Sequence, residues 1–401
     1  MSVSSHDVLV TGIGLVSSLG EGIDAHVEKL AADGPRPVLN TEEFAPFLVH
    51  PLPPVDWSTQ IPKKGDQRQM ETWQKLGTFA AGLALSDAAV GTDPAERGAI
   101  DMIVAAGGGE RDLQVDSLVM ERARGLDDPQ SLINQTLTNE LRPTLFLAQL
   151  SNLMAGNISI VHKVTGSSRT FMGEEASGIS AVATAAARIA AGQSEICLIG
   201  GAFSAPRKEL ISNYAMGGFL SSGDWSPVFQ RRDAQLGFVP GSVGAFLVLE
   251  SAEHASRRGA RAYARVAQVA ADRGARTEEA FATRIKALLN EIGADDDEAL
   301  LVLSGASGCQ PVTEWEKSAL DERLQRAALR SFGSLLGHSL EAHFFAGIAL
   351  GAAALHSGRG LAPFDPIAER ASSVAPSQAL ITTVGHVSGE GMCRLVAVDP
   401  S

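Results

Sequence analysis

The hydrophobic positions of this chain form two kinds of pattern, one typical of helices and one typical of strands. Residues 179–191 repeat Ile, Val and Ala every three or four positions, and this spacing predicts a buried helix that begins just after a turn at residues 173–178. The run Ile-Cys-Leu-Ile at 196–199 is wholly apolar and ends in two glycines, as is typical of a parallel strand covered on both faces. With a short strand before the turn, residues 166–201 predict one strand–turn–helix–strand unit.

The rest of the chain predicts further elements of the same kinds. Apolar runs predict strands within 7–20, 102–109, 245–250, 262–271 and 299–303, and helical spacing predicts a helix over 73–88. Residues 34–65 are rich in proline and polar side chains and predict a surface excursion. The first strand is expected to lead into a glycine turn at Gly12 and Gly14. A dinucleotide-binding fingerprint would need a third glycine at the position of Ser17, so that function is not expected.

The predicted turn places Glu175 at the amino end of the central helix. The first N–H groups of a helix have no partner within it, and the aligned peptide dipoles add a partial positive charge there. A carboxylate is therefore favoured at this position.

Composition narrows the class of protein. The 401 residues are 45% hydrophobic, enough for a large buried core, and no apolar run approaches the roughly 20 residues that a membrane span needs. The three cysteines, Cys197, Cys309 and Cys393, have no paired spacing, so neither a disulfide framework nor a metal cluster is expected. A formal net charge of −13 argues against non-specific nucleic-acid binding. The amino terminus lacks the basic and apolar regions of a signal peptide, and we expect a cytoplasmic protein.

Residues 173–201 resemble the nucleophile turn of the β-ketoacyl-acyl-carrier-protein synthases, the condensing enzymes of the thiolase superfamily. In that family the turn reads Ala-Cys-Ala-Ser-Gly and precedes a helix of small residues and a strand that ends in Gly-Gly. Ala176, Ser177 and Gly178 match the motif, and Glu175 stands at the position of the cysteine. The segment Leu-Val-Thr-Gly-Ile-Gly at 9–14 is similar to the opening strand of the family.

This resemblance implies a thiolase-like α/β fold, in which duplicated βα halves form a five-layered αβαβα sandwich. The amino-terminal half is expected over residues 1–255 and the carboxy-terminal half over residues 256–401. The two halves share no sequence repeat, so the division depends on the resemblance.

The resemblance also assigns the positions of the catalytic groups, and most of these groups are missing. The family uses a cysteine nucleophile, two histidines that stabilise developing negative charge, and a lysine that supports them. Besides Glu175 at the cysteine, Gly305 stands at the first histidine and Gly333 at the lysine, while His338 matches the second histidine. No residue is therefore assigned as catalytic, and neither a cofactor nor a metal ion is expected.

Three roles are open for Glu175. As a nucleophile, its carboxylate would attack a thioester and give an anhydride, which is a poor intermediate. As a structural anion, it would accept hydrogen bonds from the amino end of its helix and pair with His338. As an inert residue, it would only fill an unused pocket. The structural anion is the favoured hypothesis.

Other residues near the expected site have structural explanations. Cys309 is an alternative nucleophile, although a cysteine without a positioned histidine is usually a packing residue. His386 lies in the glycine-rich loop that gates the site in the family, and a surface or structural role is favoured over one in the pocket. His343 is expected to pack or to cap rather than to bind metal. The glycines at 107–109 are expected at a subunit contact rather than at a phosphate site.

The resemblance implies a non-catalytic subunit similar to the chain-length factors, which pair with a catalytic synthase and shape the acyl tunnel at the shared interface. Those proteins also lack the cysteine, usually with glutamine in its place, and Glu175 departs from them in that respect. The expected partner is a cysteine-bearing β-ketoacyl synthase paralogue, in a heterodimer for fatty-acid (including very-long-chain), polyketide or polyene synthesis. The alternatives are an active 3-oxoacyl-ACP synthase or malonyl-ACP decarboxylase with an altered site, and a homodimeric acyl-binding protein.

Acyl carrier proteins are acidic, so the resemblance implies docking through local basic groups despite the net charge of −13. Five candidates lie on the family's docking helix and after the Gly-Gly strand: Lys63, Lys64, Arg68, Arg207 and Lys208. A solvated surface is an equally good explanation of these residues.

Overall fold

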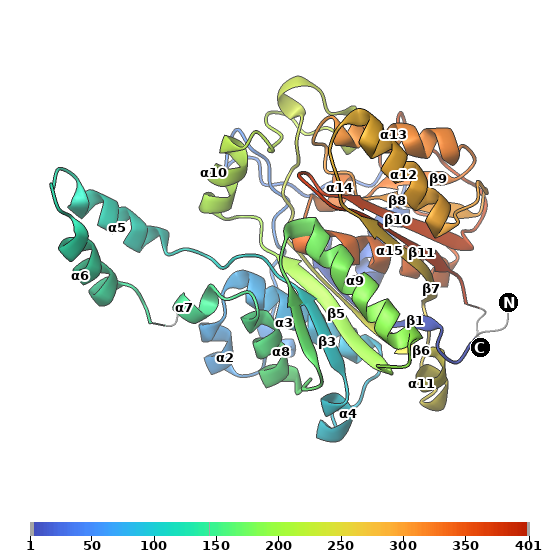
Figure 1. Cartoon of the computed structure of the whole chain (residues 1–401), viewed down its shortest axis with the longest axis horizontal. Coiled ribbons are helices and arrows are strands. Elements are labelled where there is room, and N and C mark those ends of the chain that lie inside the picture. Colours follow the sequence, from blue (N-terminus) through green and yellow to red (C-terminus); the bar gives the residue numbers. More distant parts are fainter. Residues whose placement is uncertain (1–3, 144, 399–401) are drawn as a thin grey trace.

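The structure of the chain is a computed structural model that describes residues 4–143 and 145–398. The described strands form one 11-stranded sheet that consists of two similar parts (Figure 1). The first part has the order β4-β3-β5-β6-β1. In it β3 is parallel to β4 and β5, whereas β6 is antiparallel to β5 and β1. The bounds are β1 Val8–Ser17, β3 Asp101–Ala105, β4 Ser168–Phe171, β5 Ile196–Phe203 and β6 Val243–Ser251.

The second part repeats this arrangement and joins the first through a short pairing of β1 with β7. Its order from the outer edge is β9-β8-β10-β11-β7, and its parallel and antiparallel pairs fall at the same places. The duplicated halves predicted from the resemblance are therefore confirmed. Their division at residue 255 stays a prediction; the helix α11 (Ala252–Arg257) lies between β6 and β7. The bounds are β7 Ala264–Asp272, β8 Leu300–Ser304, β9 Ala328–Ser331, β10 Gln378–Val384 and β11 Glu390–Val396.

Helices cover the outer face of each part and fill the space between the two parts (Figure 1). α3 and α8 pack on the outer face of the first part, α12 and α13 on the outer face of the second, and α9 and α15 lie between them. The layers are thus helix, sheet, helix, sheet and helix, so the predicted five-layered sandwich is confirmed. The bounds are α3 Thr72–Asp87, α8 Leu153–His162, α9 Glu174–Ala190, α12 Glu278–Ile292, α13 Val312–Arg323 and α15 His343–Ser357.

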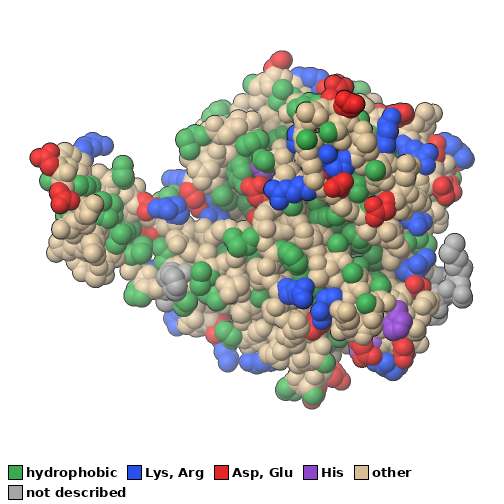
Figure 2. Space-filling view, viewed as in Figure 1, with side chains coloured by type: hydrophobic (Ala, Val, Ile, Leu, Met, Phe, Trp, Pro, Cys, Tyr) green, Lys and Arg blue, Asp and Glu red, His purple; other side chains and the backbone are tan. Residues whose placement is uncertain are grey.

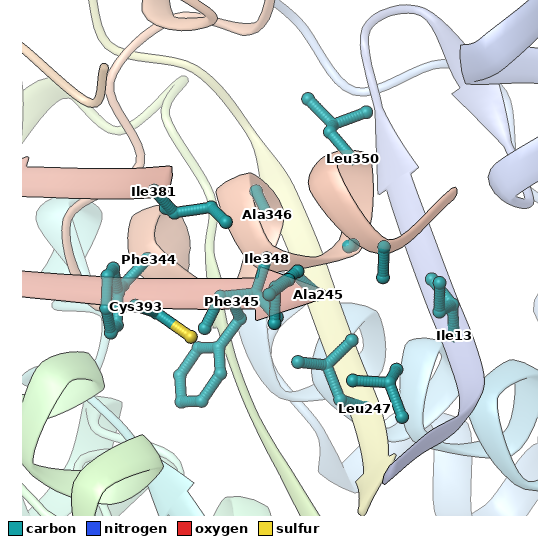
Figure 3. Packing of buried hydrophobic residues seen from close by; sticks show 14 of the residues in the cluster. Ile13, Ala245, Leu247, Phe344, Phe345, Ala346, Ile348, Leu350, Ile381 and Cys393 are labelled. Atoms are coloured by element: carbon teal, nitrogen blue, oxygen red, sulfur yellow. The ribbon is translucent and has the colours of Figure 1, made fainter. Parts of the chain in front are cut away.

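Consecutive side chains of a strand enter different cores, because they alternate between its two faces. In β5, Ile199 faces the central helices and Leu198 faces α3 and α8. In β8, Leu303 and Val302 divide in the same way between the central core and the core under α12 and α13. Figure 3 shows the central core, where side chains of α15 such as Phe345 lie between strands of the two parts.

The first strand differs from its prediction, because Gly12 and Gly14 lie within β1 and not in a turn. A Cβ atom on Gly14 would lie 1.9 Å from the carbonyl oxygen of Ala80, and one on Gly12 would lie 2.4 Å from that of Ala84. Both carbonyls belong to α3. The two glycines therefore allow this helix to approach the strand closely.

Residues 110–143 leave the main body as an arm (Figure 1). In the arm, α5 (Leu113–Ala123) packs against α6 (Gln130–Glu140). Figure 2 shows the arm standing clear of the body, with hydrophobic side chains on its surface. Met120 is 72% exposed and Leu126 is 49% exposed. Apolar side chains gathered on a projecting pair of helices are typical of a surface that another molecule covers.

The remaining elements are mostly short. Residues 34–65, the predicted surface excursion, hold no long helix, yet they bury Val49 and Ile61. Along the described part of the chain, no helix combines the length and the apolar character that crossing a bilayer requires. A cytoplasmic location stays a prediction. The remaining bounds are β2 Gly20–Glu21, α1 Ile23–Ala31, η1 Trp57–Thr59, α2 Lys64–Gln69, α4 Pro94–Gly98, α7 Leu145–Ala148, α10 Lys208–Met216, η2 Val228–Gln230, η3 Asp233–Gln235, α14 Gly333–Leu336 and η4 Leu340–Ala342.

Candidate functional site

The turn between β4 and α9 presents Glu175 to the interior of the protein. Gly173 has a φ angle of 129° and Glu174 one of 53°, so the backbone reverses sharply through the left-handed region. α9 begins at Glu174, and Glu175 lies in its first turn with 1% of the residue exposed. The strand–turn–helix–strand unit predicted over 166–201 is therefore present, although its helix begins at Glu174, five residues earlier than predicted.

Two imidazoles from the second half of the chain enclose the Glu175 carboxylate. His338 Nε2 lies 2.6 Å from Glu175 Oε1, and His386 Nδ1 lies 2.9 Å from the same oxygen. The backbone N–H of His386 donates to this oxygen as well, at 3.1 Å. His338 is 2% exposed and His386 is 7% exposed. We call Glu175, His338 and His386 the central cluster.

Tight turns hold both histidines in place. His338 follows Gly337, which ends α14 with a φ angle of 75°. His386 lies in the loop between β10 and β11, where the N–H of Gly385 donates to the carbonyl of Gly389 at 2.8 Å. The glycine-rich loop predicted as a gate thus lies against Glu175.

The central cluster is a buried ion pair. Burial opposes the charge on Glu175, but the hydrogen bonds from His338 and His386 outweigh it and hold the pKa of the carboxyl well below its usual value. Burial also opposes a charge on His386, yet the hydrogen bond and negative charge of Glu175, together with Glu174, raise the pKa of this imidazole. Glu175 is therefore ionised at neutral pH, and its Oε1 accepts three hydrogen bonds.

The hypothesis of a structural anion agrees with the structure in one respect and fails in another. The expected pairing with His338 is present. The hydrogen bonds that the described residues give to the carboxylate come from His338 and His386, however, and not from the amino end of α9. A charged imidazole is a stronger donor to a carboxylate than a neutral backbone N–H. Side chains and backbone of the second half of the chain, rather than N–H groups of the helix end, therefore hold Glu175 by hydrogen bonds.

A surface or structural role was favoured for His386, and the structure contradicts the surface role but not the structural one. The imidazole is buried, and its ring centroid lies 4.8 to 5.6 Å from those of Tyr214, Phe219 and Phe238. A histidine inside a glycine-rich loop was the available signal. Its contact with Glu175 spans 211 residues of sequence, and no local pattern reveals a contact of that kind.

His343 fills the space beside the two glycines that stand at catalytic positions. A Cβ atom on Gly305 would lie 2.7 Å from the carbonyl oxygen of Thr382 and 3.1 Å from Cδ2 of His343. One on Gly333 would lie 3.7 Å from Cε1 of His343. His343 Nε2 donates to the carbonyl of Gly305 at 3.2 Å, and burial, with the neighbouring His338, holds the pKa of this imidazole well below its usual value. His343 is a neutral packing residue, as predicted.

Cys309 is not positioned to act as a nucleophile. Its Sγ lies 3.8 Å from the carbonyl oxygen of Phe219, within the core under α12 and α13. Burial raises the pKa of the thiol to about 11. A thiol that stays protonated at neutral pH is a weak nucleophile, which favours the packing role.

A cavity of ≈ 200 Å³ lies beside the central cluster and is lined by Glu174, Tyr214, Glu341 and the glycines at 107 and 108, among others. The Tyr214 O–H donates to Glu174 Oε1 at 2.7 Å. Glu341 is 5% exposed, and burial raises the pKa of its carboxyl to about 7. Met172, which follows β4 and is exposed, also lines the cavity. The cavity therefore lies next to the outer strand of the first half.

The five predicted docking cations differ in their surroundings. Arg207 has a side chain that is 10% exposed, and it donates to Glu209 Oε1 at 2.6 Å and to the carbonyl of Gly109 at 2.7 Å. This internal ion pair makes Arg207 a poor docking residue. The other four are exposed at α2 and at the start of α10: Lys63, Lys64, Arg68 and Lys208.

Known proteins share both the motifs and the fold. Residues 5–255 match the model of the β-ketoacyl synthase N-terminal domain. The chain belongs to the β-ketoacyl synthase family. One relative, 3-oxoacyl-[acyl-carrier-protein] synthase 2 of Vibrio harveyi, is 26% identical over 270 residues. These residues span 65% of this chain but only 62% of the length of that protein. The tetracenomycin polyketide synthase ketoacyl synthase beta subunit of Streptomyces glaucescens is 26% identical over 330 residues, 79% of this chain and 76% of that protein.

A solved structure is similar to this chain over nearly its whole length. The ishigamide ketosynthase/chain length factor covers 99% of this chain and is itself covered completely, with a TM-score of 0.78 and 20% identity. This shows a common fold, which is the thiolase-like sandwich expected from the motifs. Within that fold, this family member holds a buried carboxylate at the position that the resemblance assigns to the nucleophile, and a second imidazole, His386, beside it.

Proposed function

We propose that this chain is a non-catalytic, chain-length-factor-like subunit that pairs with a cysteine-bearing β-ketoacyl synthase paralogue. The central cluster carries the proposal, because the residue at the nucleophile position is a buried carboxylate with three hydrogen bonds on one oxygen. Condensation needs a nucleophile that holds the growing acyl chain. Glu175 would form an anhydride with that chain, and its Oε1 is already engaged.

The packing around the cluster supports the same proposal. A histidine at position 305 would need the backbone of Thr382 and the ring of His343 to move, because a Cβ atom there already lies 2.7 Å and 3.1 Å from them. Well-packed interiors resist such additions. The chain thus lacks the room for the missing histidine as well as the histidine itself.

Two exposed features support a paired subunit. Within the described chain, β4 pairs with β3 on one side only, and Ser168 and Arg169 are exposed. An unpaired strand edge is a template for another strand. The arm extends from the same half of the chain with Met120 and Leu126 exposed. A partner strand along β4 and a partner surface against the arm would cover both features.

The relatives suggest what kind of protein the partner is. They include a polyketide synthase beta subunit and a ketosynthase/chain length factor. In the pair we propose, the partner supplies the cysteine, and this chain supplies stability and part of the wall of the acyl tunnel. The cavity lined by Glu174, Tyr214 and Glu341 would contribute to that wall, since it lies beside β4. The pathway is then fatty-acid synthesis, including very long chains, or polyketide or polyene synthesis.

An acidic acyl carrier protein would dock through the exposed cations of α2, Lys64 and Arg68, together with Lys63 and Lys208. Attraction between exposed charges weakens as salt screens them. We therefore expect carrier binding to weaken between low and high salt. Binding that is unchanged by salt would contradict this part of the proposal.

Malonyl-ACP decarboxylation is the second candidate function, because the fold brings two imidazoles together at the site. Such a pair is suited to stabilising an enolate oxyanion. Both rings, however, donate to Glu175, and this carboxylate would repel the carboxylate of a malonyl group. We therefore rank decarboxylation below the non-catalytic role.

The test is malonyl-dependent elongation of an acyl carrier substrate, with release of CO₂ measured in parallel. The chain is assayed alone and in a complex co-purified with a cysteine-bearing paralogue. We expect elongation by the complex only, and its loss when the cysteine of the paralogue is replaced by alanine. Elongation or CO₂ release by the chain alone, abolished by Glu175→Gln, would overturn the proposal and make this chain an enzyme.

A further inference from the structure

The central cluster holds three buried titratable side chains, whereas a residue that only fills an unused pocket does not need to be titratable. Glu175, His338 and His386 come from three separate segments and converge in the interior. Burying three polar side chains is costly unless each is satisfied. We propose that Glu175, His338 and His386 form a binding site for one divalent transition-metal ion of the Zn²⁺ type. This goes beyond the proposed function and does not depend on it.

The distances suit such a site after a small adjustment. One ligand atom from each of the three side chains lies within 4.8 Å of the other two. Two atoms that bind one tetrahedral ion at about 2.1 Å stand about 3.4 Å apart. His338 Nε2 and His386 Nδ1 now lie 2.6 Å and 2.9 Å from Glu175 Oε1. Each imidazole would therefore retreat by less than about 1 Å from the carboxylate to admit the ion.

The set of donors identifies the class of metal. Two imidazole nitrogens and one carboxylate oxygen are typical ligands of Zn²⁺ and of neighbouring divalent ions such as Co²⁺. Mg²⁺ and Ca²⁺ prefer sites made of oxygen alone. No metal was expected because the three cysteines lack paired spacing. A site made of histidine and glutamate does not depend on the spacing of cysteines.

The hydrogen bonds within the cluster join the same atoms that would bind the ion. The lone pairs that bind a metal also bind protons, so an ion and the bridging protons compete for the same atoms. In the structure, a ring nitrogen of each imidazole lies within hydrogen-bonding distance of Glu175 Oε1. Metal binding would release protons from the cluster, and affinity should rise with pH.

The Glu174 carboxylate lies beside the second ring nitrogen of His386. The second ring nitrogen, Nε2, lies 3.7 Å from Glu174 Oε2, and Glu174 accepts a hydrogen bond from Tyr214 at 2.7 Å. Histidines that bind metals commonly have a carboxylate beside their other nitrogen, which orients the ring and makes it a stronger ligand. Glu174 has a φ of 53°, a strained conformation that persists only where surrounding contacts hold it. Orienting His386 gives this strained residue a role.

An ion at this site would join segments that are far apart in sequence. Glu175 is 163 residues from His338 and 211 residues from His386. The ion would tie the start of α9 to the turn after α14 and to the loop between β10 and β11. It would thus close the altered pocket in one fixed arrangement, with no nucleophile exposed.

The experiment uses the full chain, purified without a histidine tag and stripped of metal with a chelator. Zn²⁺ is added, excess ion is removed by desalting, and the metal content is measured; Co²⁺ serves as a spectroscopic probe of a tetrahedral site. We expect one Zn²⁺ per chain, and a thermal unfolding midpoint that rises with Zn²⁺. Glu175→Gln and His386→Gln should each lose stoichiometric Zn²⁺ and the Co²⁺ spectrum.

Two further variants separate a metal site from a general effect on folding. Glu174→Gln should keep the site but weaken Zn²⁺ binding about 10-fold to 100-fold, because it removes only the outer carboxylate. His162→Gln changes a part-buried histidine outside the cluster, which bonds to the carbonyl of Thr78, and should bind Zn²⁺ like the unmodified chain. Circular dichroism establishes that each variant is folded before metal is added.

The proposal is overturned if the folded, unmodified chain retains no Zn²⁺, or if Glu175→Gln and His386→Gln retain as much as the unmodified chain. In either case protons alone hold the cluster together. The experiment involves neither a partner nor an acyl substrate. Its failure is therefore distinct from a failure of the elongation assay.

Discussion

β4 and β9 occupy the same place in the two halves, as the outer strands beside β3 and β8, but their surroundings differ. All four residues of β9 are buried, whereas the first two residues of β4 are exposed. The chain itself covers β9: the N–H of Leu329 donates to the carbonyl of Arg370 at 3.1 Å, and the N–H of Ser331 donates to the Glu369 carboxylate at 2.7 Å. No segment among the described residues covers β4 in this way.

This difference separates an edge that the chain completes by itself from an edge that it leaves open. Unpaired N–H and C=O groups along a strand need partners, and another strand supplies them well. The half with the open edge also carries the arm and the altered nucleophile turn. The duplicated fold therefore combines a half closed by its own chain with a half suited to a partner.

Removing the cover of β9 should have the largest effect. The Glu369 carboxylate accepts hydrogen bonds from the N–H groups of Ser331, Phe364 and Asp365. Glu369→Ala would leave buried donors without partners, and we expect the free energy of unfolding to fall by about 3 to 5 kcal/mol. Ser168→Ala on the open strand β4 is the matched control and should change it by less than about 0.5 kcal/mol. Urea denaturation of both variants measures the contrast, and equal losses would contradict it.

The cavity beside the open edge should make stability depend on pH. Burial raises the pKa of Glu341 from 4.5 to about 7, so the folded chain keeps a proton that the unfolded chain has lost. The contribution of Glu341 to the free energy of unfolding should therefore fall by up to about 3 kcal/mol as pH rises from about 4.5 to about 7, and stay constant above that. Glu341→Gln should remove this part of the dependence. The check is urea denaturation across this pH range, and identical pH profiles for the two proteins would refute it.

Blocking the open edge should weaken pairing without weakening the fold. The carbonyls of Ser167 and Phe171 accept hydrogen bonds from Met102 of β3 and from Ala106 just after it. The alternation of the strand therefore turns the N–H of Thr170 outward. Thr170→Pro removes this N–H, and proline is tolerated on edge strands. We expect association with the cysteine-bearing paralogue to weaken about 10-fold or more, which corresponds to roughly 1.4 kcal/mol.

Analytical ultracentrifugation of the Thr170→Pro complex gives the association constant, and thermal unfolding of the chain alone serves as the control. Unchanged association of a folded variant would show that the open edge of β4 does not bind the partner.

A charge on the arm should have the smallest effect. Met120 is 72% exposed, so Met120→Glu should change the free energy of unfolding by less than about 0.5 kcal/mol. If a partner covers the arm, burying this charge should weaken association several-fold. Glu121→Gln, next in sequence, controls for a general change in charge. Surface plasmon resonance with the paralogue measures both variants, and equal affinities would show that the arm stays uncovered.

Several elements could be predicted from the sequence because local patterns specify them. The spacing of apolar residues at 179–191 predicted α9, and the apolar run at 196–199 predicted β5. Glu175 could be assigned to the start of α9 for the same reason, although the helix begins at Glu174 and not after residue 178. Gly12 and Gly14 were misjudged, because a glycine that admits a neighbouring helix looks the same in sequence as a glycine in a turn.

The central cluster was only partly predictable. The pairing of Glu175 with His338 followed from the resemblance, whereas the contact with His386 did not. Arg207 looked like a surface cation, yet its ion pair with Glu209 and its contact with Gly109 withdraw it from solvent. Both observations concern side chains whose surroundings come from other parts of the chain.

The sequence alone determined which residue stands at the nucleophile turn. It also showed that the family's cysteine, first histidine and lysine are absent. Both results follow from residue identity and local spacing. The tertiary structure decided what those absences mean. It brought His386 across 211 residues to Glu175, placed His343 in the space beside Gly305, and left β4 open while covering β9. Contacts of this kind depend on how the layers pack, because burial and hydrogen bonding act between segments that are close in space and distant in the chain.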